Sequence, residues 1–194
     1  MKLVMKLLLI PCILLLTILS ALGKKDPEPT RFANAIAAFE KEDGKSKPVA
    51  NLTVFTGSSS IRMWKSLDRD FPKLHVLNRG FGGSQISDVL HYFDIVVSRH
   101  KPNAIVLYCG ENDLWFGKSP KQVFSDFEEF VKRVHDLSSS TQIHYLACKP
   151  SPARFSMWRT YQDCNRLIAK KCSKDGRLNF VDVSSVMLGK KGEP

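Results

Sequence analysis

Short apolar segments alternate along the chain with longer segments in which apolar residues recur every three to four positions. The short segments predict five strands, over residues 51–55, 74–78, 103–109, 142–148 and 178–183. The longer segments predict helices over residues 30–43, 61–71, 85–100, 120–137 and 158–174. Strands that alternate with helices are typical of βαβ units, so we expect an α/β protein with a five-stranded parallel sheet and helices on both faces.

The first 23 residues differ from the rest of the chain. Lys2 and Lys6 precede an apolar run from Leu7 to Leu22, which ends in the small-residue sequence ALG. This pattern predicts a secretory signal peptide cleaved after Gly23. A retained membrane anchor is the alternative, although the run is slightly short for a full span.

We therefore expect a signal peptide over residues 1–23, a linker and N-terminal helix over 24–49, and one α/β domain over 50–194. The protein would then be secreted or periplasmic, with membrane contact only through its N-terminal segment.

The net charge is +10, or +8 once Lys2 and Lys6 leave with the signal peptide. The basic residues are scattered, with only short Lys-Lys pairs at positions 24, 170 and 190. A solvated basic surface explains this pattern better than a nucleic-acid site, so we expect no nucleic-acid partner.

Four cysteines follow the signal peptide: Cys109, Cys148, Cys164 and Cys172. They lack the spacing and the histidine neighbours of a zinc site, so we expect no metal and no other cofactor. Cys109 and Cys148 end two strands that could be neighbours, which leaves a disulfide open. Buried free thiols are the preferred interpretation.

Three of the predicted strands are followed by unusual loops. These are GSSS (57–60), NRGFGGSQ (78–85) and CGENDLWFG (109–117). Ligands of open α/β sheets bind at the carboxyl ends of the strands, so the three loops should meet at one edge. The loop after the fourth strand, KPSPARFSMW (149–158), is long and contains two prolines.

Each of the three loops can supply one part of an acyl-transfer site. A serine at a strand-to-helix turn can attack an acyl carbon while its own backbone N–H faces the developing oxyanion. The backbone N–H of Gly83 and the side-chain amide of Asn112 can provide two further donors. Taken singly, the loops also have structural explanations: Ser59 or Ser60 can cap a helix, the glycines can form a turn, and Asn112 can cap or turn.

The segments FTGSSS, NRGFGGS and GEND resemble blocks I, II and III of the SGNH (GDSL-type) hydrolases, in the family's order and approximate spacing. The resemblance covers nearly all of residues 50–190 and implies a flavodoxin-like three-layer sandwich. It also implies that Ser59 is the nucleophile, and that the Ser59 amide, Gly83 and Asn112 form the oxyanion hole. The family hydrolyses esters and some thioesters, or removes acyl groups from carbohydrates, without a metal. The expected substrate is therefore a small-molecule or carbohydrate ester.

The sequence departs from the family pattern in two places. Ser58 stands where the family has the aspartate of Gly-Asp-Ser. The family's general base lies in an Asp-x-x-His motif after the fifth strand, and the sequence reaches Pro194 without that motif. We therefore expect a C-terminally incomplete domain with little turnover of its own.

The five histidines are weak substitutes for this base, because the predicted elements place them away from the serine loop: His75, His91, His100, His135 and His144. Asp88 and His91 fit Asp-x-x-His literally, but they lie inside a predicted helix. Two alternatives stay open. One is a non-catalytic protein that binds acyl or glycan ligands on the same fold. The other is a nucleotide-binding protein, disfavoured because the glycine-rich loop follows the second strand instead of the first.

Overall fold

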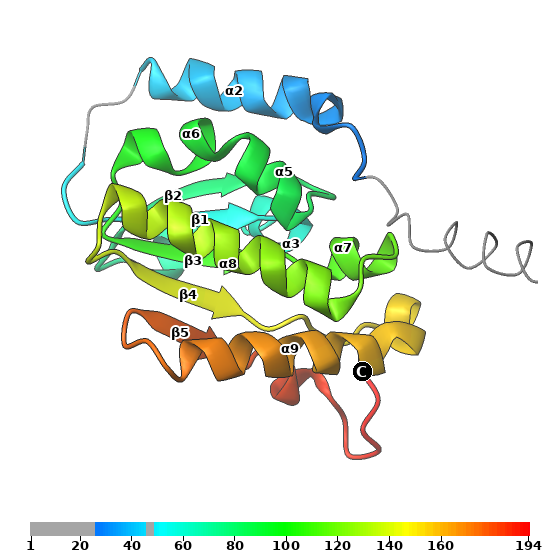
Figure 1. Ribbon diagram of the computed structural model, residues 1–194. Coiled ribbons are helices and arrows are strands. Elements are labelled where there is room, and N and C mark those ends of the chain that lie inside the picture. Colours follow the sequence, from blue (N-terminus) through cyan, green and yellow to red (C-terminus); the bar gives the residue numbers. More distant parts are fainter. Residues whose placement is uncertain (1–25, 46–48) are drawn as a thin grey trace, which may run out of the picture.

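The centre of the molecule is a sheet of five parallel strands (Figure 1). The structure, a computed structural model, describes residues 26–45 and 49–194, so the predicted signal peptide lies outside the described residues. The strands are β1 (Leu52–Gly57), β2 (His75–Gly80), β3 (Ala104–Tyr108), β4 (Gln142–Leu146) and β5 (Leu178–Val181). Their order, β2-β1-β3-β4-β5, is that of the flavodoxin-like folds. The predicted α/β class and parallel sheet are confirmed.

The first three strands end level with one another. Gly57 lies opposite Gly80 of β2 and opposite Tyr108 of β3. Gly57 has a φ of 116°, and a Cβ there would lie 2.1 Å from the carbonyl oxygen of Tyr108. The next residue, Ser58, donates its backbone N–H to that same oxygen at 2.9 Å. The chain therefore leaves β1 in a tight turn that only glycine fits, and the loops after β1, β2 and β3 open at one edge.

Most of the helices cover one face of the sheet (Figure 1). They are α2 (Ala33–Asp43), α5 (Ile86–His91), α6 (Phe93–Val96), α8 (Pro120–Leu137) and α9 (Trp158–Cys172). Strands and helices share one apolar core that removes large side chains from water. Its members include Ile36, Val89, Phe93, Ile105, Leu107, Phe127, Phe130, Tyr145 and Ile168.

The other face is covered more thinly in the described part of the chain. The short helices α3 (Ser59–Arg62) and α4 (Leu67–Asp70) pack there against Phe55, Val106 and Tyr108. Beyond β3 on this face, His144 and Leu146 of β4 are only half-buried, and Val181 of β5 is 38% exposed. The sheet is therefore well protected at β1–β3 and less so at β4–β5.

The predicted continuous helix over residues 85–100 is wrong. The segment forms α5, α6 and the 3-10 turn η3 (Ser98–His100), with breaks at Tyr92 and Val97. The Tyr92 hydroxyl donates to the carbonyl of Pro29 at 3.0 Å, which holds the 3-10 turn η2 (Pro29–Phe32) against the core. This tertiary contact outweighs the helical pattern of the segment.

The predicted helix over residues 61–71 is also divided, into α3 and α4. The indole N–H of Trp64 donates to Asp70 at 2.5 Å, and the ring packs against Phe55 and Phe71, so the chain bends around this side chain. Three short elements occur where none was predicted: α7 (Glu111–Trp115), η4 (Pro152–Met157) and η5 (Ser185–Met187).

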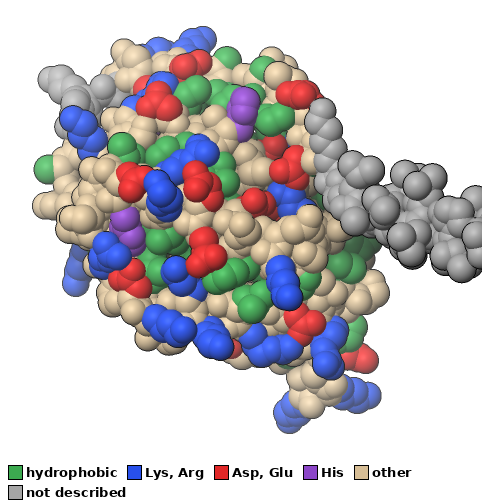
Figure 2. Space-filling view, viewed as in Figure 1, with side chains coloured by type: hydrophobic (Ala, Val, Ile, Leu, Met, Phe, Trp, Pro, Cys, Tyr) green, Lys and Arg blue, Asp and Glu red, His purple; other side chains and the backbone are tan. Residues whose placement is uncertain are grey.

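Charges of both signs are interspersed over the face formed by α8 and α9 (Figure 2). Lys171 of α9 pairs with Glu128 of α8 at 3.0 Å, and Lys132 pairs with Asp136 within α8 at 2.6 Å. Among residues 26–45 and 49–194, no helix combines the length and apolar character needed to cross a membrane.

Candidate active site

Ser59 is the first residue of α3, at the carboxyl end of β1. Ser58 before it is the N-cap residue and is buried, 4% exposed. Burial raises the pKa of Tyr108, and the nearby Ser60 hydroxyl acts in the opposite direction. Ser59 is half-buried, and neither its hydroxyl nor its backbone N–H has a hydrogen-bond partner among the described residues. Ser59 therefore has both its donor and its nucleophile available, whereas Ser58 is buried.

Gly83 lies in the loop after β2, three residues beyond the end of the strand. Its φ is 88°, and a Cβ built on it would meet no atom within 4 Å. It is exposed, whereas Ser84 beside it is fully buried. The loop thus turns into the protein at Ser84 and presents the backbone of Gly83 to open space.

Asn112 is the second residue of α7 and is 7% exposed. Its Nδ2 donates to the carbonyl oxygen of Ser84 at 3.1 Å, and its Oδ1 accepts from Nη1 of Arg154 at 3.0 Å. One carboxamide therefore connects the loops that follow β2, β3 and β4.

Arg154 was missed in the sequence analysis. It lies in η4, inside the long loop after β4, and its only signal was the length and proline content of that loop. Its guanidinium also lies over the ring of Trp115, 5.0 Å from the centroid.

Two acidic residues flank Asn112, and each accepts hydrogen bonds from a different loop. Glu111 accepts hydrogen bonds from the Tyr108 hydroxyl and from the backbone N–H of Lys149, the latter at 2.9 Å. Asp113 is fully buried and accepts the backbone N–H of Ile86 at 2.9 Å. Burial raises the pKa of Asp113 to about 7, against the lowering effect of the Lys118 ammonium. Both carboxylates are thus used to fix the loops around the site.

Four of the histidines lie at the opposite edge of the sheet or within it. His75 begins β2, His100 ends η3 just before β3, and His135 lies near the end of α8, where its Nε2 is 3.2 Å from the Thr141 carbonyl oxygen. His144 is the third residue of β4. None of these lies at the carboxyl edge of the first three strands.

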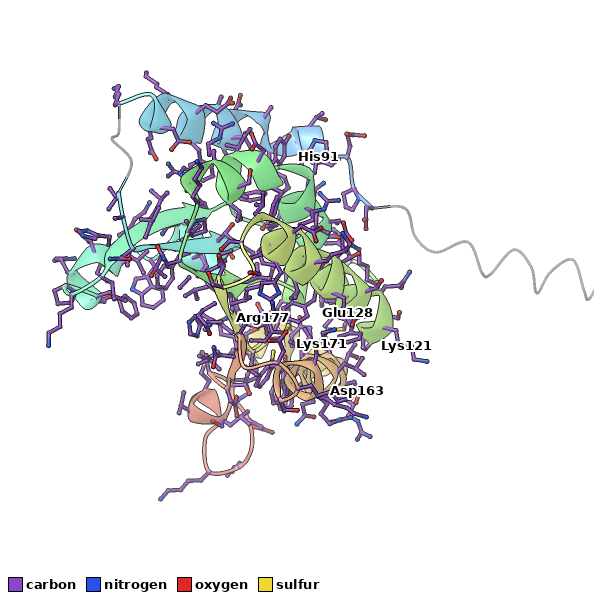
Figure 3. The ribbon with its side chains drawn as sticks, turned by 60° about the vertical axis from the view of Figure 1, so that its left-hand side comes forward. His91, Lys121, Glu128, Asp163, Lys171 and Arg177 are labelled. Atoms are coloured by element: carbon purple, nitrogen blue, oxygen red, sulfur yellow. The ribbon has the colours of Figure 1, made fainter. Side chains whose placement is uncertain are left out.

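His91 is the last residue of α5 and is exposed, near the start of α2 (Figure 3). Its potential partner Asp88 is buried, pairs with Arg31 at 2.5 Å and accepts the backbone N–H of Gln85 at 2.8 Å. Asp88 therefore holds η2 onto α5 and does not orient His91. Within the described residues no histidine is placed to take a proton from Ser59.

The four cysteines Cys109, Cys148, Cys164 and Cys172 are free and buried. Cys109 donates its thiol to the carbonyl oxygen of Ser84 at 3.2 Å, and Cys148 lies 3.5 Å from the Tyr145 hydroxyl. The possible disulfide between Cys109 and Cys148 is not formed, and the preferred interpretation of buried thiols matches the structure.

The strand order and the loops at the carboxyl edge define a flavodoxin-like α/β protein. The chain belongs to the GDSL-like lipase/acylhydrolase family, whose family model matches residues 50–194. No curated protein matched the sequence.

Solved structures with the same fold come from several bacteria. A protein from Streptococcus pneumonia described as a platelet activating factor has a TM-score of 0.72 at 18% identity, over 83% of this chain and 78% of the other. A GDSL-like lipase from Bacteroides thetaiotaomicron has a TM-score of 0.66 at 17% identity, over 81% and 82%. A catalytic mutant of an acetylxylan esterase from Geobacillus stearothermophilus has a TM-score of 0.57 at 15% identity, over 76% and 87%. At these identities the likeness shows the fold alone.

Proposed function

We propose that this chain is a serine esterase that attacks an ester of a small molecule or an acylated carbohydrate with Ser59. The observation that carries the proposal is the position of Ser59: it is half-buried at the start of α3, at the carboxyl end of β1, with no hydrogen-bond partner for its hydroxyl among the described residues, whereas Ser58 is buried. Membership of an acylhydrolase family, and the acetylxylan esterase among the structures of the same fold, support this substrate class.

In the proposed reaction the Ser59 hydroxyl oxygen bonds to the acyl carbon and the ester oxygen leaves as an alcohol. The backbone N–H groups of Ser59 and Gly83 and the Nδ2 amide of Asn112 stabilise the oxyanion of the tetrahedral intermediate. Water then releases the acid from the acyl-enzyme. Both steps need a group that takes the proton from the attacking oxygen, that of Ser59 in the first step and of water in the second, and passes it to the departing oxygen, because a serine hydroxyl is a poor nucleophile at neutral pH.

A binding protein without turnover is the second candidate, and a specific observation favours it. Within the described residues, no histidine lies at the carboxyl edge of the first three strands, where the base would have to stand. In subtilisin, loss of the catalytic histidine costs about 10⁶-fold in kcat. A protein of this kind would hold an acylated ligand at the same edge without cleaving it.

An experiment that supplies the missing base distinguishes the esterase from the binding protein. The full chain is assayed with p-nitrophenyl acetate alone, with added imidazole, and after appending an Asp-x-x-His segment behind Pro194. We expect little turnover alone and an increase of several orders of magnitude with the appended motif, because base and oxyanion donors act as a unit. Imidazole should give a smaller gain above the Ser59→Ala background.

Serine and asparagine variants identify the residues responsible. Ser59→Ala should abolish the gain, whereas Ser58→Ala and Ser60→Ala should cost much less. Asn112→Ala should lower kcat by about 10² to 10³, the usual loss for one oxyanion donor. Activity that survives Ser59→Ala but is lost in Ser60→Ala would move the nucleophile by one residue. No gain from either source of base, together with calorimetric binding of acetylated xylooligosaccharide, would favour the binding protein.

We also propose that the protein is exported and that residues 1–23 are its signal peptide. Expressed in its host, the protein should be found outside the cytoplasm, and N-terminal sequencing should begin at Lys24. Full-length protein in the cytosol would contradict this.

A further inference from the structure

The Asn112 carboxamide is held between two groups of opposite hydrogen-bonding character. On one side lies the Ser84 carbonyl oxygen, which can only accept a hydrogen bond and accepts one from Nδ2 at 3.1 Å. On the other side the Arg154 guanidinium, which can only donate, binds Oδ1 at 3.0 Å. A flipped carboxamide would place donor against donor and acceptor against acceptor. The two contacts therefore select one orientation of the side chain.

The hydrogen bond to the Ser84 carbonyl oxygen engages only Nδ2 and would by itself leave Oδ1 of Asn112 without a partner. This carbonyl also accepts the thiol of Cys109 at 3.2 Å, so Asn112 shares it with a second donor. Arg154 supplies the matching contact at Oδ1 and, being always charged, makes the stronger kind of hydrogen bond.

Arg154 is itself held in place by α7. Asn112 and Trp115 are three residues apart on this helix, a spacing that puts both on one side of it. The guanidinium lies 5.0 Å from the centroid of the Trp115 ring while it binds Asn112, so it spans both residues. Its backbone departs from helical geometry inside η4, with φ −130° and ψ 25°, which is the local kink that brings the side chain to α7.

We propose that Arg154 is a positioning residue for the oxyanion hole: it fixes the Asn112 carboxamide so that one N–H of Nδ2 stays on Ser84 and the other is directed to the oxyanion. The inference rests on the proposed function, because it assigns Arg154 a role in that reaction. It makes the loop after β4 part of the site without giving it a group that touches the reacting atoms.

Nuclear magnetic resonance of the full, ¹⁵N-labelled chain tests the positioning directly. The side-chain amide signals of Asn112, assigned by their loss in Asn112→Ala, are compared in wild type, Arg154→Met and Arg154→Lys. Arg159→Met is the matched control, since Arg159 is exposed on the neighbouring helix α9 and far less buried than Arg154. We expect the two Asn112 amide protons to shift and to exchange with solvent at least about tenfold faster in Arg154→Met, with partial recovery in Arg154→Lys and no change in the control.

Unchanged Asn112 signals in both Arg154 variants overturn the proposal. So does a change confined to the backbone signals of residues 150–157, which would show that Arg154 only stabilises its own loop. If Arg154→Met does not fold, the comparison of Arg154→Lys with wild type decides by the same criteria.

Steady-state kinetics of the chain that carries the appended Asp-x-x-His segment provide the second measurement. Arg154→Met should lower kcat by about tenfold or more with KM little changed, and should add nothing in an Asn112→Ala background, because the two residues act through one group. Additive losses overturn the proposal. If no variant shows Ser59-dependent turnover, the proposed function fails, and the resonance comparison still decides whether Arg154 positions Asn112.

Discussion

Asp113 is a buried acid whose proton is linked to folding. Its Oδ1 accepts a hydrogen bond from the backbone N–H of Ile86 and lies 3.6 Å from Nζ of Lys118. Its Oδ2 is buried and has no hydrogen-bond partner among the described residues. Burial raises its pKa from 3.8 to about 7, so the folded protein binds this proton more tightly than the unfolded chain does. The contribution of this proton to stability is present below pH 4 and is lost as the pH rises towards 7.

We expect Asp113→Asn to remove that pH dependence. Between pH 4 and pH 8, the free energy of unfolding of wild type should fall relative to the variant by on the order of 3 to 4 kcal/mol, since a pKa difference of one corresponds to about 1.4 kcal/mol. Urea unfolding at a series of pH values measures the difference. Asp68→Asn, at an exposed position of α4, is the control and should track wild type. A constant difference between wild type and Asp113→Asn would show that Asp113 titrates normally.

At the scale of single elements, the strands and the helices α8 and α9 could be predicted, whereas the short helices could not. The helix over residues 120–137 was predicted with the bounds that α8 has, because its apolar residues recur at helical spacing and Pro120 opens it. In the structure Ser119 and Gln122 also form a capping box at this end. All these signals lie within the segment itself. The five strands were found for the same reason, with ends differing by a few residues.

The helix breaks at Tyr92 and Trp64 could not be predicted, because both side chains bind partners that the fold brings to them. α7 is five residues long, too short to show a helical period. Of the candidate site, the meeting of the three loops could be predicted because parallel strands end at one edge, and the roles of Ser59, Gly83 and Asn112 stay a prediction. Arg154 is separated from Asn112 by α8 and β4, so their contact is visible only in the folded chain.

At the scale of the whole molecule, the two faces of the sheet are covered unequally. The core between the sheet and α2, α5, α6, α8 and α9 includes residues of β3, β4 and β5, whereas the core under α3 and α4 stops at β3 and Leu146. Stability therefore rests mainly on the first of these two cores.

The thin cover over β5 has a consequence for amide hydrogen exchange. β5 is a four-residue edge strand that, among the described strands, pairs with β4 alone, and Val181 is 38% exposed on the uncovered side. We expect this edge to open in local fluctuations that leave β1–β3 intact. The amide of Ala147, which donates to the Val181 carbonyl at 3.0 Å, should then exchange at least about tenfold faster than the amides of β1, a difference of about 1.4 kcal/mol in opening free energy. Mass spectrometry of peptides from β1 and from β4–β5 measures both rates. Equal protection would mean that the sheet opens only as a whole, whereas faster exchange at β5 would identify this edge as the least stable part of the sheet.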